Sequence, residues 1–376
     1  MRNIELVDLK AQYCKIKPQI DNAIQEVIET TSFINGPAVK RFKENLSIYL
    51  DNIHIVPCAN GTDALQIGMM ALDLQPGDEV ITPAFTYAAT AEVLALLGLI
   101  PKFVDVDEQS FNINPEKVEE AIGPKTKAMV PVHLFGQCAD METLMKIAKE
   151  KNIWVIEDLA QSIGAKYFYS NGTEKYSGSI GNIGGTSFFP SKNLGCYGDG
   201  GAIITSDIAL AEKAAMIANH GQSSLYYHDI VGMNSRLDSI QAAVLNIKLK
   251  YLQEYNAARQ KAANLYDDQL KTIGAISIPY RSQNSTHVFH QYTLTIKDGS
   301  RDQLKLALDK QGIPNKIYYP VPLHLQKAYN IIGYKPGDIP VSEKLANSVI
   351  SLPMHTELDE EQIEFICSNI QSFYKK

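Results

Sequence analysis

One lysine stands alone in a neutral stretch of the chain. Lys192 lies in SFFPSKNLG (187–195), directly after Phe188, Phe189 and Pro190, and the glycine-rich segments GSIGNIGG and CYGDGGAIIT flank this stretch. Apolar neighbours desolvate an amine, which lowers the pKa of a lysine and makes its neutral form accessible. Neutral amines attack carbonyl groups to form Schiff bases. The alternative is a surface lysine whose stem covers an aromatic ring.

A carboxylate ends one of the apolar runs. WVIED (154–158) ends in Asp158, and Gln161 follows three residues later. A carboxylate at the end of a buried strand is costly unless it has a partner. Two interpretations of Asp158 are open: it caps a following helix, or it binds a cationic ring nitrogen.

Two further segments follow apolar runs. In CANGTDAL (58–65), Gly61 and Thr62 offer backbone N–H groups and a hydroxyl at a helix N-terminus, where a phosphate binds readily. In TPAFTYAAT (82–90), Tyr87 is suited to stack on a flat ring. For Gly61 and Thr62 the alternative is an ordinary helix cap, and for Tyr87 it is simple packing. The phosphate-loop and dinucleotide glycine fingerprints are absent from the sequence.

Taken together, these residues match the requirements of pyridoxal phosphate. Its phosphate needs N–H and hydroxyl donors, its pyridinium nitrogen needs a carboxylate, and its aldehyde needs a lysine. Ser187, five residues before Lys192, adds a further hydroxyl. The combination therefore predicts a pyridoxal-phosphate site.

The elements that position these residues form an alternating pattern. Between residues 55 and 205, short apolar runs alternate with helical patterns, which predicts an α/β fold with a mostly parallel sheet between helices. The runs are IVPCA (55–59), EVITPA (79–84), PKFVDVD (101–107), KAMVPVHLFG (127–136), IWVIED (153–158), GTSFF (185–189) and GAIIT (201–205). In such sheets ligands bind beyond the carboxyl ends of the strands, where the candidate residues fall.

Beyond Arg236 the pattern changes. A helical stripe ends near Tyr251, followed by a long helix-prone segment, the strand-like HVFHQYTLTI (287–296), the helical RDQLKLALDKQG (301–312) and a closing helix near 360–374. We therefore expect a large domain over residues 1–250, including an N-terminal helical segment, and a small α+β domain over residues 251–376.

Composition limits the function. The 376 residues carry a net charge of −7, which argues against nucleic-acid binding. No apolar run is long enough to cross a membrane, and the charged N-terminus does not look like a signal peptide. The five cysteines include no C-x-x-C pair, which favours reduced thiols in the cytoplasm. We expect no metal site.

The motifs resemble those of the sugar-nucleotide aminotransferases of the DegT/DnrJ/EryC/StrS group, which are fold type I pyridoxal-phosphate enzymes. The resemblance covers nearly the whole chain. It is carried by FVDVD, VHLFGQCADM, VIEDLAQSIGA, GTSFFPSKNLGCYGDGGAI, ANHGQ, GMNSRLDSIQAAVL, YYPVPLHLQ and SLPMH. The segments around Lys192 and Thr62 are most similar to the subgroup that aminates UDP-2-acetamido-2-deoxy-3-oxo-glucuronate at C3 for bacterial surface polysaccharide, such as O-antigen.

The resemblance implies a role for each candidate residue. Lys192 forms the Schiff base, Asp158 pairs with the ring nitrogen, Gln161 contacts the ring hydroxyl and Tyr87 stacks on the ring. The phosphate ligands are Gly61, Thr62, Ser187 and, from a neighbouring subunit, Asn234. Arg236, Tyr319 and His324 are expected to face the substrate.

The resemblance also implies the reaction partners. A homodimer with shared active sites moves an amino group from L-glutamate to a nucleotide sugar through the pyridoxamine form of the cofactor. Three alternatives are open: a dTDP-3-oxo-6-deoxyhexose substrate, a non-catalytic cofactor-binding regulator, and a nicotinamide-dependent oxidoreductase. The last lacks its glycine fingerprint. Related sugar 3-dehydratases carry histidine at the lysine position, so Lys192 favours transamination.

Overall fold

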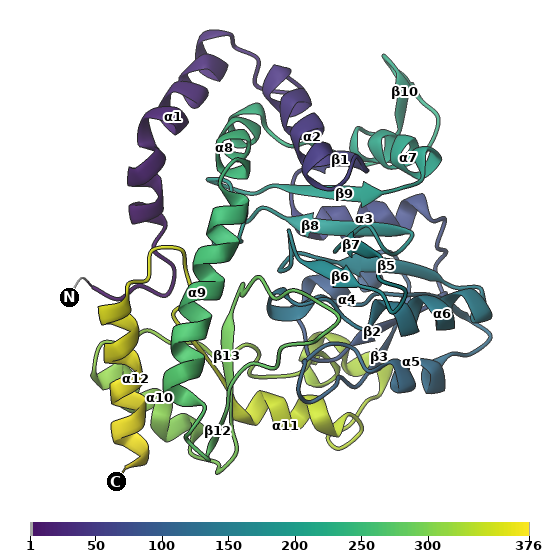
Figure 1. The fold of residues 1–376 in the computed structure, drawn as a ribbon. Coiled ribbons are helices and arrows are strands. Elements are labelled where there is room, and N and C mark those ends of the chain that lie inside the picture. Colours follow the sequence, from purple (N-terminus) through teal and green to yellow (C-terminus); the bar gives the residue numbers. More distant parts are fainter. Residues whose placement is uncertain (1–2, 376) are drawn as a thin grey trace.

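The computed structural model describes residues 3–375, and a seven-stranded sheet forms its centre (Figure 1). In sheet order the strands are β1 (His54–Cys58), β9 (Gly201–Thr205), β8 (Ile183–Ser187), β5 (Trp154–Asp158), β4 (Thr126–Met129), β2 (Glu79–Pro83) and β3 (Ile100–Val104). Only β9 pairs antiparallel with its neighbours in this sheet. Each predicted apolar run overlaps one of these strands, which confirms the α/β prediction.

Helices cover both faces of this sheet (Figure 1). α3 (Gly61–Ala71), α4 (Ala89–Leu96) and α7 (Ile208–Ala218) pack on one face, and α2 (Pro37–Tyr49) and α8 (Ser239–Leu249) pack on the other. The alternation of strand side chains divides the two cores: Ile203 belongs to the first, and Ala202 and Ile204 belong to the second. α5 (Pro115–Ala121) packs against β3, and α6 (Met141–Lys151) packs against β5.

A separate core, beyond those of the large sheet, surrounds a three-stranded antiparallel sheet. Its strands are β12 (Ile276–Ser277), β13 (Tyr292–Ile296) and β14 (Val349–Leu352), and its helices include α10 (Arg301–Lys310) and α12 (Glu360–Tyr374). α9 (Leu252–Leu270) connects the large sheet with the three-stranded one. Leu252 packs in the core that α2 and α8 form with the large sheet, and Tyr266 packs in the core of the three-stranded sheet. The domain division at residue 250 stays a prediction.

Other elements were not predicted from the sequence. They are the hairpins β6 (Lys166–Phe168) to β7 (Glu174–Tyr176) and β10 (Gln222–Ser224) to β11 (Tyr227–His228), and α11 (Pro340–Ser348). α1 (Leu9–Glu29) provides the expected N-terminal helix. Of the strand-like segment 287–296, only the second half forms β13.

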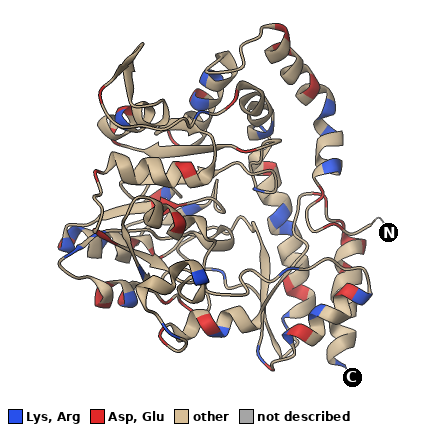
Figure 2. Cartoon of the chain, turned by 180° about the vertical axis from the view of Figure 1, so that it is seen from behind, with Lys and Arg blue, Asp and Glu red and all other residues tan. Residues whose placement is uncertain are grey.

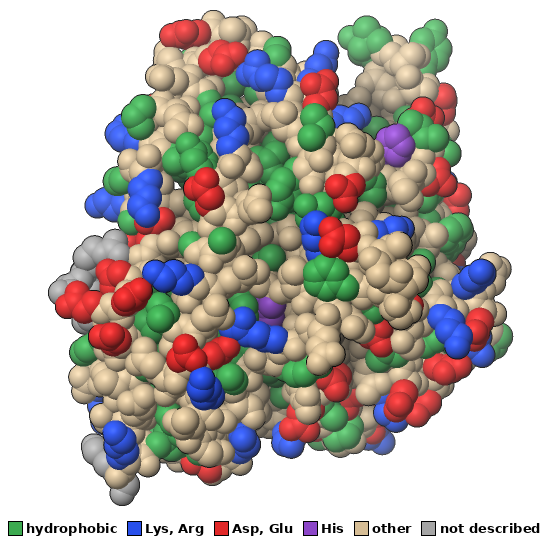
Figure 3. All heavy atoms as spheres, viewed as in Figure 1, with side chains coloured by type: hydrophobic (Ala, Val, Ile, Leu, Met, Phe, Trp, Pro, Cys, Tyr) green, Lys and Arg blue, Asp and Glu red, His purple; other side chains and the backbone are tan. Residues whose placement is uncertain are grey.

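Charge is mixed over the surface, whereas one hairpin is apolar. Figure 2 shows acidic and basic side chains interspersed along the helices. At the tip of the β10–β11 hairpin, Leu225, Tyr226 and Tyr227 are 73%, 83% and 70% exposed, and green side chains project there at the top right of Figure 3. Within residues 3–375, no helix is both long and apolar enough to span a membrane.

Candidate active site

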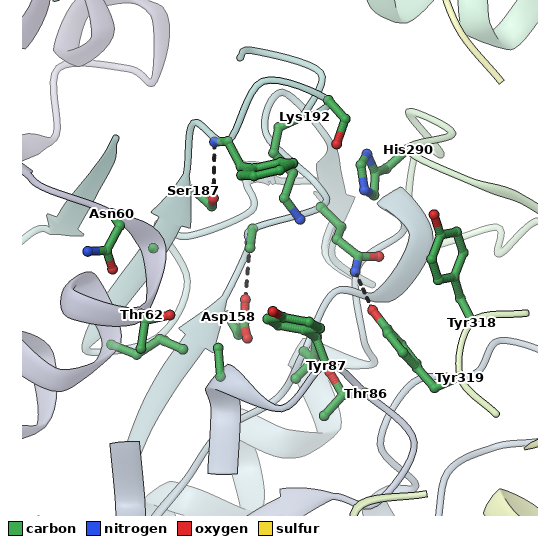
Figure 4. Close-up of a pocket in the computed structure, with 18 of the residues that line it drawn as sticks. Asn60, Thr62, Thr86, Tyr87, Asp158, Ser187, Lys192, His290, Tyr318 and Tyr319 are labelled. Atoms are coloured by element: carbon green, nitrogen blue, oxygen red, sulfur yellow. Dashed lines mark hydrogen bonds between the residues drawn. The ribbon is translucent and has the colours of Figure 1, made fainter. Parts of the chain in front are cut away.

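A cavity of about 840 Å³ brings most of the candidate residues together (Figure 4). Eight residues singled out from the sequence line it: Gly61, Thr62, Tyr87, Asp158, Gln161, Ser187, Lys192 and Tyr319. They come from the ends of β5 and β8, from the start of α3 and from loops, and Ile317–Pro320 closes one side. The cavity therefore lies where the carboxyl ends of parallel strands predicted it.

One end of the cavity is suited to an anion. Asn60 caps α3, because its side chain accepts a hydrogen bond from the Asp63 N–H at 2.8 Å. The first N–H groups of α3, at Gly61 and Thr62, therefore remain free of this cap. Gly61 lies so close to Ser187 that an added Cβ would be 2.6 Å from the Ser187 Cβ atom. The residue that caps α3 is therefore Asn60 and not Thr62, and Thr62 lines the cavity.

Asp158 lies at the centre of the site with one donor on each carboxylate oxygen. Its Oδ1 atom accepts from the Ala160 N–H at 3.1 Å, and its Oδ2 atom accepts from the Thr90 hydroxyl at 2.7 Å. A turn follows Asp158, so the helix-cap alternative does not hold. Asp158 is 6% exposed, which leaves its carboxylate facing only the cavity.

Lys192 extends from a tightly folded loop. Its N–H donates to the Phe189 carbonyl at 2.8 Å, and the next side chain, Asn193, donates to Asn256 Oδ1 at 2.8 Å and to the Val288 carbonyl at 2.9 Å. The Lys192 amine has no hydrogen-bond partner among residues 3–375. Burial lowers the pKa of Lys192 to about 8, although the charge of Asp158 opposes this shift. A substantial minority of the amine is therefore neutral near physiological pH.

The cavity is also lined by Tyr87, Gln161 and Tyr319. Gln161 accepts from the Phe135 N–H at 2.7 Å and donates to the Tyr319 hydroxyl at 3.0 Å, so its amide is held from both ends. Tyr87 is 61% exposed and lines the cavity, so it is not a core residue. Burial raises the pKa of the Tyr319 hydroxyl, which therefore stays neutral at physiological pH.

Three predicted residues lie outside this cavity. Asn234 is exposed in the segment before α8, and Arg236 is half-buried there; among residues 3–375 its Nε atom has no hydrogen-bond partner. His324 is buried, and its Nε2 atom lies 3.0 Å from Glu343 Oε1. The cavity of one chain does not include these three side chains, and their expected roles stay predictions.

Sequence reasoning missed two residues at the site. Thr90 ends the segment TPAFTYAAT, and its hydroxyl contacts Asp158. The one sequence signal for this contact is the position of Thr90, three residues after Tyr87. His290 lies in the segment predicted as a strand, yet it lines the cavity (Figure 4). Burial, together with the charges of Lys192 and Arg259, holds the pKa of His290 well below its ordinary value. His290 is therefore a neutral imidazole at physiological pH.

The residues present fit pyridoxal phosphate. The narrow contact at Gly61 forms a cradle beside free N–H groups and the Ser187 hydroxyl, as a phosphate requires. Asp158 suits a protonated ring nitrogen, Tyr87 offers an exposed ring, and no hydrogen bond within the described part of the chain competes for the Lys192 amine. The donor set and its spacing thus agree with the cofactor that the sequence predicted.

The fold and the site are those of a fold type I pyridoxal-phosphate enzyme. The model of the DegT/DnrJ/EryC1/StrS aminotransferase family matches residues 14–371, and the chain belongs to this family. Crystal structures share the fold over its full length. A family member from Brucella abortus is 41% identical with a TM-score of 0.94, covering 99% of this chain and all of that one. DesV of S. venezuelae, solved with a ketimine intermediate, is 36% identical with a TM-score of 0.95 and full coverage of both chains.

Curated relatives carry both enzymatic and regulatory names. The UDP-2-acetamido-2-deoxy-3-oxo-D-glucuronate aminotransferase of Pseudomonas aeruginosa is 47% identical, covering 97% of this chain and 99% of its own. A pleiotropic regulatory protein of Geobacillus stearothermophilus is 46% identical, covering 99% of both chains. The findings identify this chain as a sugar-nucleotide aminotransferase that depends on pyridoxal phosphate.

Proposed function

We propose that the protein transfers an amino group from L-glutamate to C3 of UDP-2-acetamido-2-deoxy-3-oxo-D-glucuronate. The observation that carries the reaction type is the Lys192 amine, which lines the cavity together with Asp158 and makes no hydrogen bond within residues 3–375. The likeness to the P. aeruginosa aminotransferase favours this sugar. The reaction would supply a cytoplasmic precursor of bacterial surface polysaccharide, in keeping with the five unpaired cysteines, four of them buried.

Each residue of the chain has a defined task in this proposal. When bound, pyridoxal phosphate supplies the aldehyde that receives the amino group and the ring that stabilises negative charge at the reacting carbon. Lys192 Nζ holds the aldehyde between reactions and then moves the proton as general base and acid. Asp158 holds the ring nitrogen protonated, and Tyr87 and Gln161 fix the plane of the ring. The start of α3 and Ser187 bind the phosphate.

The acidic balance of the cavity supports a shared site in a homodimer. Lys192 is the single Lys or Arg among the lining residues, whereas Asp63, Asp158 and Asp199 are acidic. A nucleotide diphosphate sugar is an anion and needs further cations or amide donors. We assign these to Asn234 and Arg236 of a second copy, and the exposed tip of the β10–β11 hairpin offers apolar surface for the contact.

Subunit mixing tests the shared site. Lys192→Ala and Asn234→Ala chains are each expected to be nearly inactive alone. After they are unfolded together and refolded in equal amounts, half of the dimers are hybrids, and each hybrid contains one intact site. About a quarter of wild-type activity should return. A mixture that stays at the parental level, with hybrids confirmed by native mass spectrometry, would remove Asn234 from the neighbouring site.

A substrate panel tests the sugar. The loaded protein is supplied with L-glutamate and one of three sugars in separate reactions: the UDP-3-oxo-glucuronate, its analogue with a hydroxymethyl group in place of the carboxylate, or a dTDP-3-oxo-6-deoxyhexose. The value of kcat/KM for each sugar is measured from the release of 2-oxoglutarate. The uronate should give the highest value, since a C6 carboxylate adds a charged contact. A higher value for the dTDP sugar would overturn the assignment. This second candidate is favoured by a 38% identical dTDP-sugar transaminase of Streptomyces venezuelae.

A further inference from the structure

The contact between α4 and β5 assigns a role to a residue outside the predicted site. We propose that Thr90 is a positioning residue that orients the Asp158 carboxylate toward the ring nitrogen of the cofactor. The Thr90 hydroxyl donates to Asp158 Oδ2 at 2.7 Å, and Thr90 is fully buried. The inference rests on the proposed role of Asp158.

The hydroxyl of Thr90 is committed to this one contact. Thr90 lies in the first turn of α4, where a threonine hydroxyl commonly bonds to nearby backbone. Here the hydroxyl donates instead to Asp158, 68 residues away in sequence. The other carboxylate oxygen already accepts from the Ala160 N–H. One donor on each oxygen fixes the plane of the carboxylate and leaves lone pairs directed into the cavity.

The same contact ties two walls of the site together. Tyr87 lies three residues before Thr90, at the entrance to α4, and Asp158 ends β5. The Thr90–Asp158 hydrogen bond therefore anchors the first turn of α4, just after the predicted stacking ring, to the carboxylate at the end of β5. Figure 4 shows Tyr87 and Asp158 near each other in the cavity. Loss of the hydroxyl would loosen both the ring and the carboxylate.

The electrostatic consequence has a definite sign. A hydrogen bond donated to a carboxylate favours its charged form. Without the Thr90 hydroxyl, the Asp158 carboxylate would keep only the Ala160 donor and would attract the proton on the ring nitrogen of bound pyridoxal phosphate more strongly. A less positive ring would withdraw less electron density from the Lys192 nitrogen when it is joined to the cofactor, so this nitrogen would hold its proton to higher pH. The pH at which the visible band of the loaded protein changes should therefore rise.

Isosteric variants test this inference. Thr90→Val removes the hydroxyl and keeps the shape, and Thr90→Ser restores the donor. Thr82→Val is the matched control, because Thr82 is also fully buried but its hydroxyl has no partner within residues 3–375. For each protein, absorbance titration gives the pH midpoint of the visible band, and equilibrium titration of the cofactor-free form gives the dissociation constant of pyridoxal phosphate.

The expected pattern separates positioning from packing. Thr90→Val should raise the midpoint by on the order of one pH unit and weaken cofactor binding about tenfold. Thr90→Ser should return both values most of the way, and Thr82→Val should match the wild type. Equal shifts in Thr90→Val and Thr82→Val, or an unchanged midpoint in folded Thr90→Val, would overturn the proposal. If Thr90→Val does not fold, Thr90→Ala takes its place under the same criteria. Neither readout needs the nucleotide sugar, so failure of the proposed function leaves this test intact.

Discussion

The titration of Lys192 follows directly from its burial. Its pKa is lowered from 10.5 to about 8, a difference of about 2.5 pH units. At pH 7 about a tenth of the amine is then neutral, roughly 300 times the fraction for an ordinary lysine. Because the Asp158 charge raises this pKa, Asp158→Asn should lower it further, on the order of one unit.

Competitive labelling of the cofactor-free protein measures this pKa. Trace acetic anhydride is applied between pH 6 and 11, and acetylation of Lys192 is quantified by mass spectrometry, with exposed Lys40 as the internal reference for reagent reactivity. The wild-type midpoint should fall near 8, and the Asp158→Asn midpoint should fall below it. A wild-type midpoint at 10 or above, or an upward shift in Asp158→Asn, would refute the argument that burial activates the amine.

Two further predictions concern packing and buried charge. Gly61→Ala places a methyl group against Ser187 and should weaken cofactor binding at least tenfold in an equilibrium titration, whereas Gly274→Ala, which meets open space, should not. Burial would raise the pKa of Glu157, but hydrogen bonds from His133 and three backbone N–H groups outweigh it and hold the pKa below its ordinary value. Its stabilising contribution is therefore full above the ordinary carboxyl pKa of about 4.3 and is lost as pH falls through the lower folded value. Glu157→Gln should lower the free energy of unfolding at pH 7 by about 3 kcal/mol in urea melts, and a loss under 1 kcal/mol would contradict this account.

Much of the large sheet could be predicted from the sequence because each strand is a short, nearly continuous apolar run. Such runs mark strands buried on both faces, and all seven did so here. Strand direction carries no comparable signal, so the antiparallel orientation of β9 became clear only in the structure. The hairpins were missed because their strands are only two or three residues long, too short to show an alternating pattern. The β10–β11 hairpin is exposed, whereas Tyr167 of β6 is buried in a core.

The candidate site was predictable where a residue follows a strand within one chain. Asp158, Thr62 and Lys192 have that position, and they meet in one cavity. Thr90 was missed because its contact joins positions 68 residues apart. Asn234 lies outside the cavity of the single chain, and its expected contact with a neighbouring chain stays a prediction. Its expected role came from family resemblance rather than from a local pattern.

The most direct test of the central claim is the donor half-reaction. Loaded protein is mixed with L-glutamate alone, and 2-oxoglutarate is quantified together with loss of the visible band, with D-glutamate and the Lys192→Ala variant as controls. An enzyme of the proposed kind yields close to one 2-oxoglutarate per active site and loses its colour only with L-glutamate. A loaded protein that keeps its colour and releases no 2-oxoglutarate would contradict glutamate-dependent transamination and favour a cofactor-binding regulator.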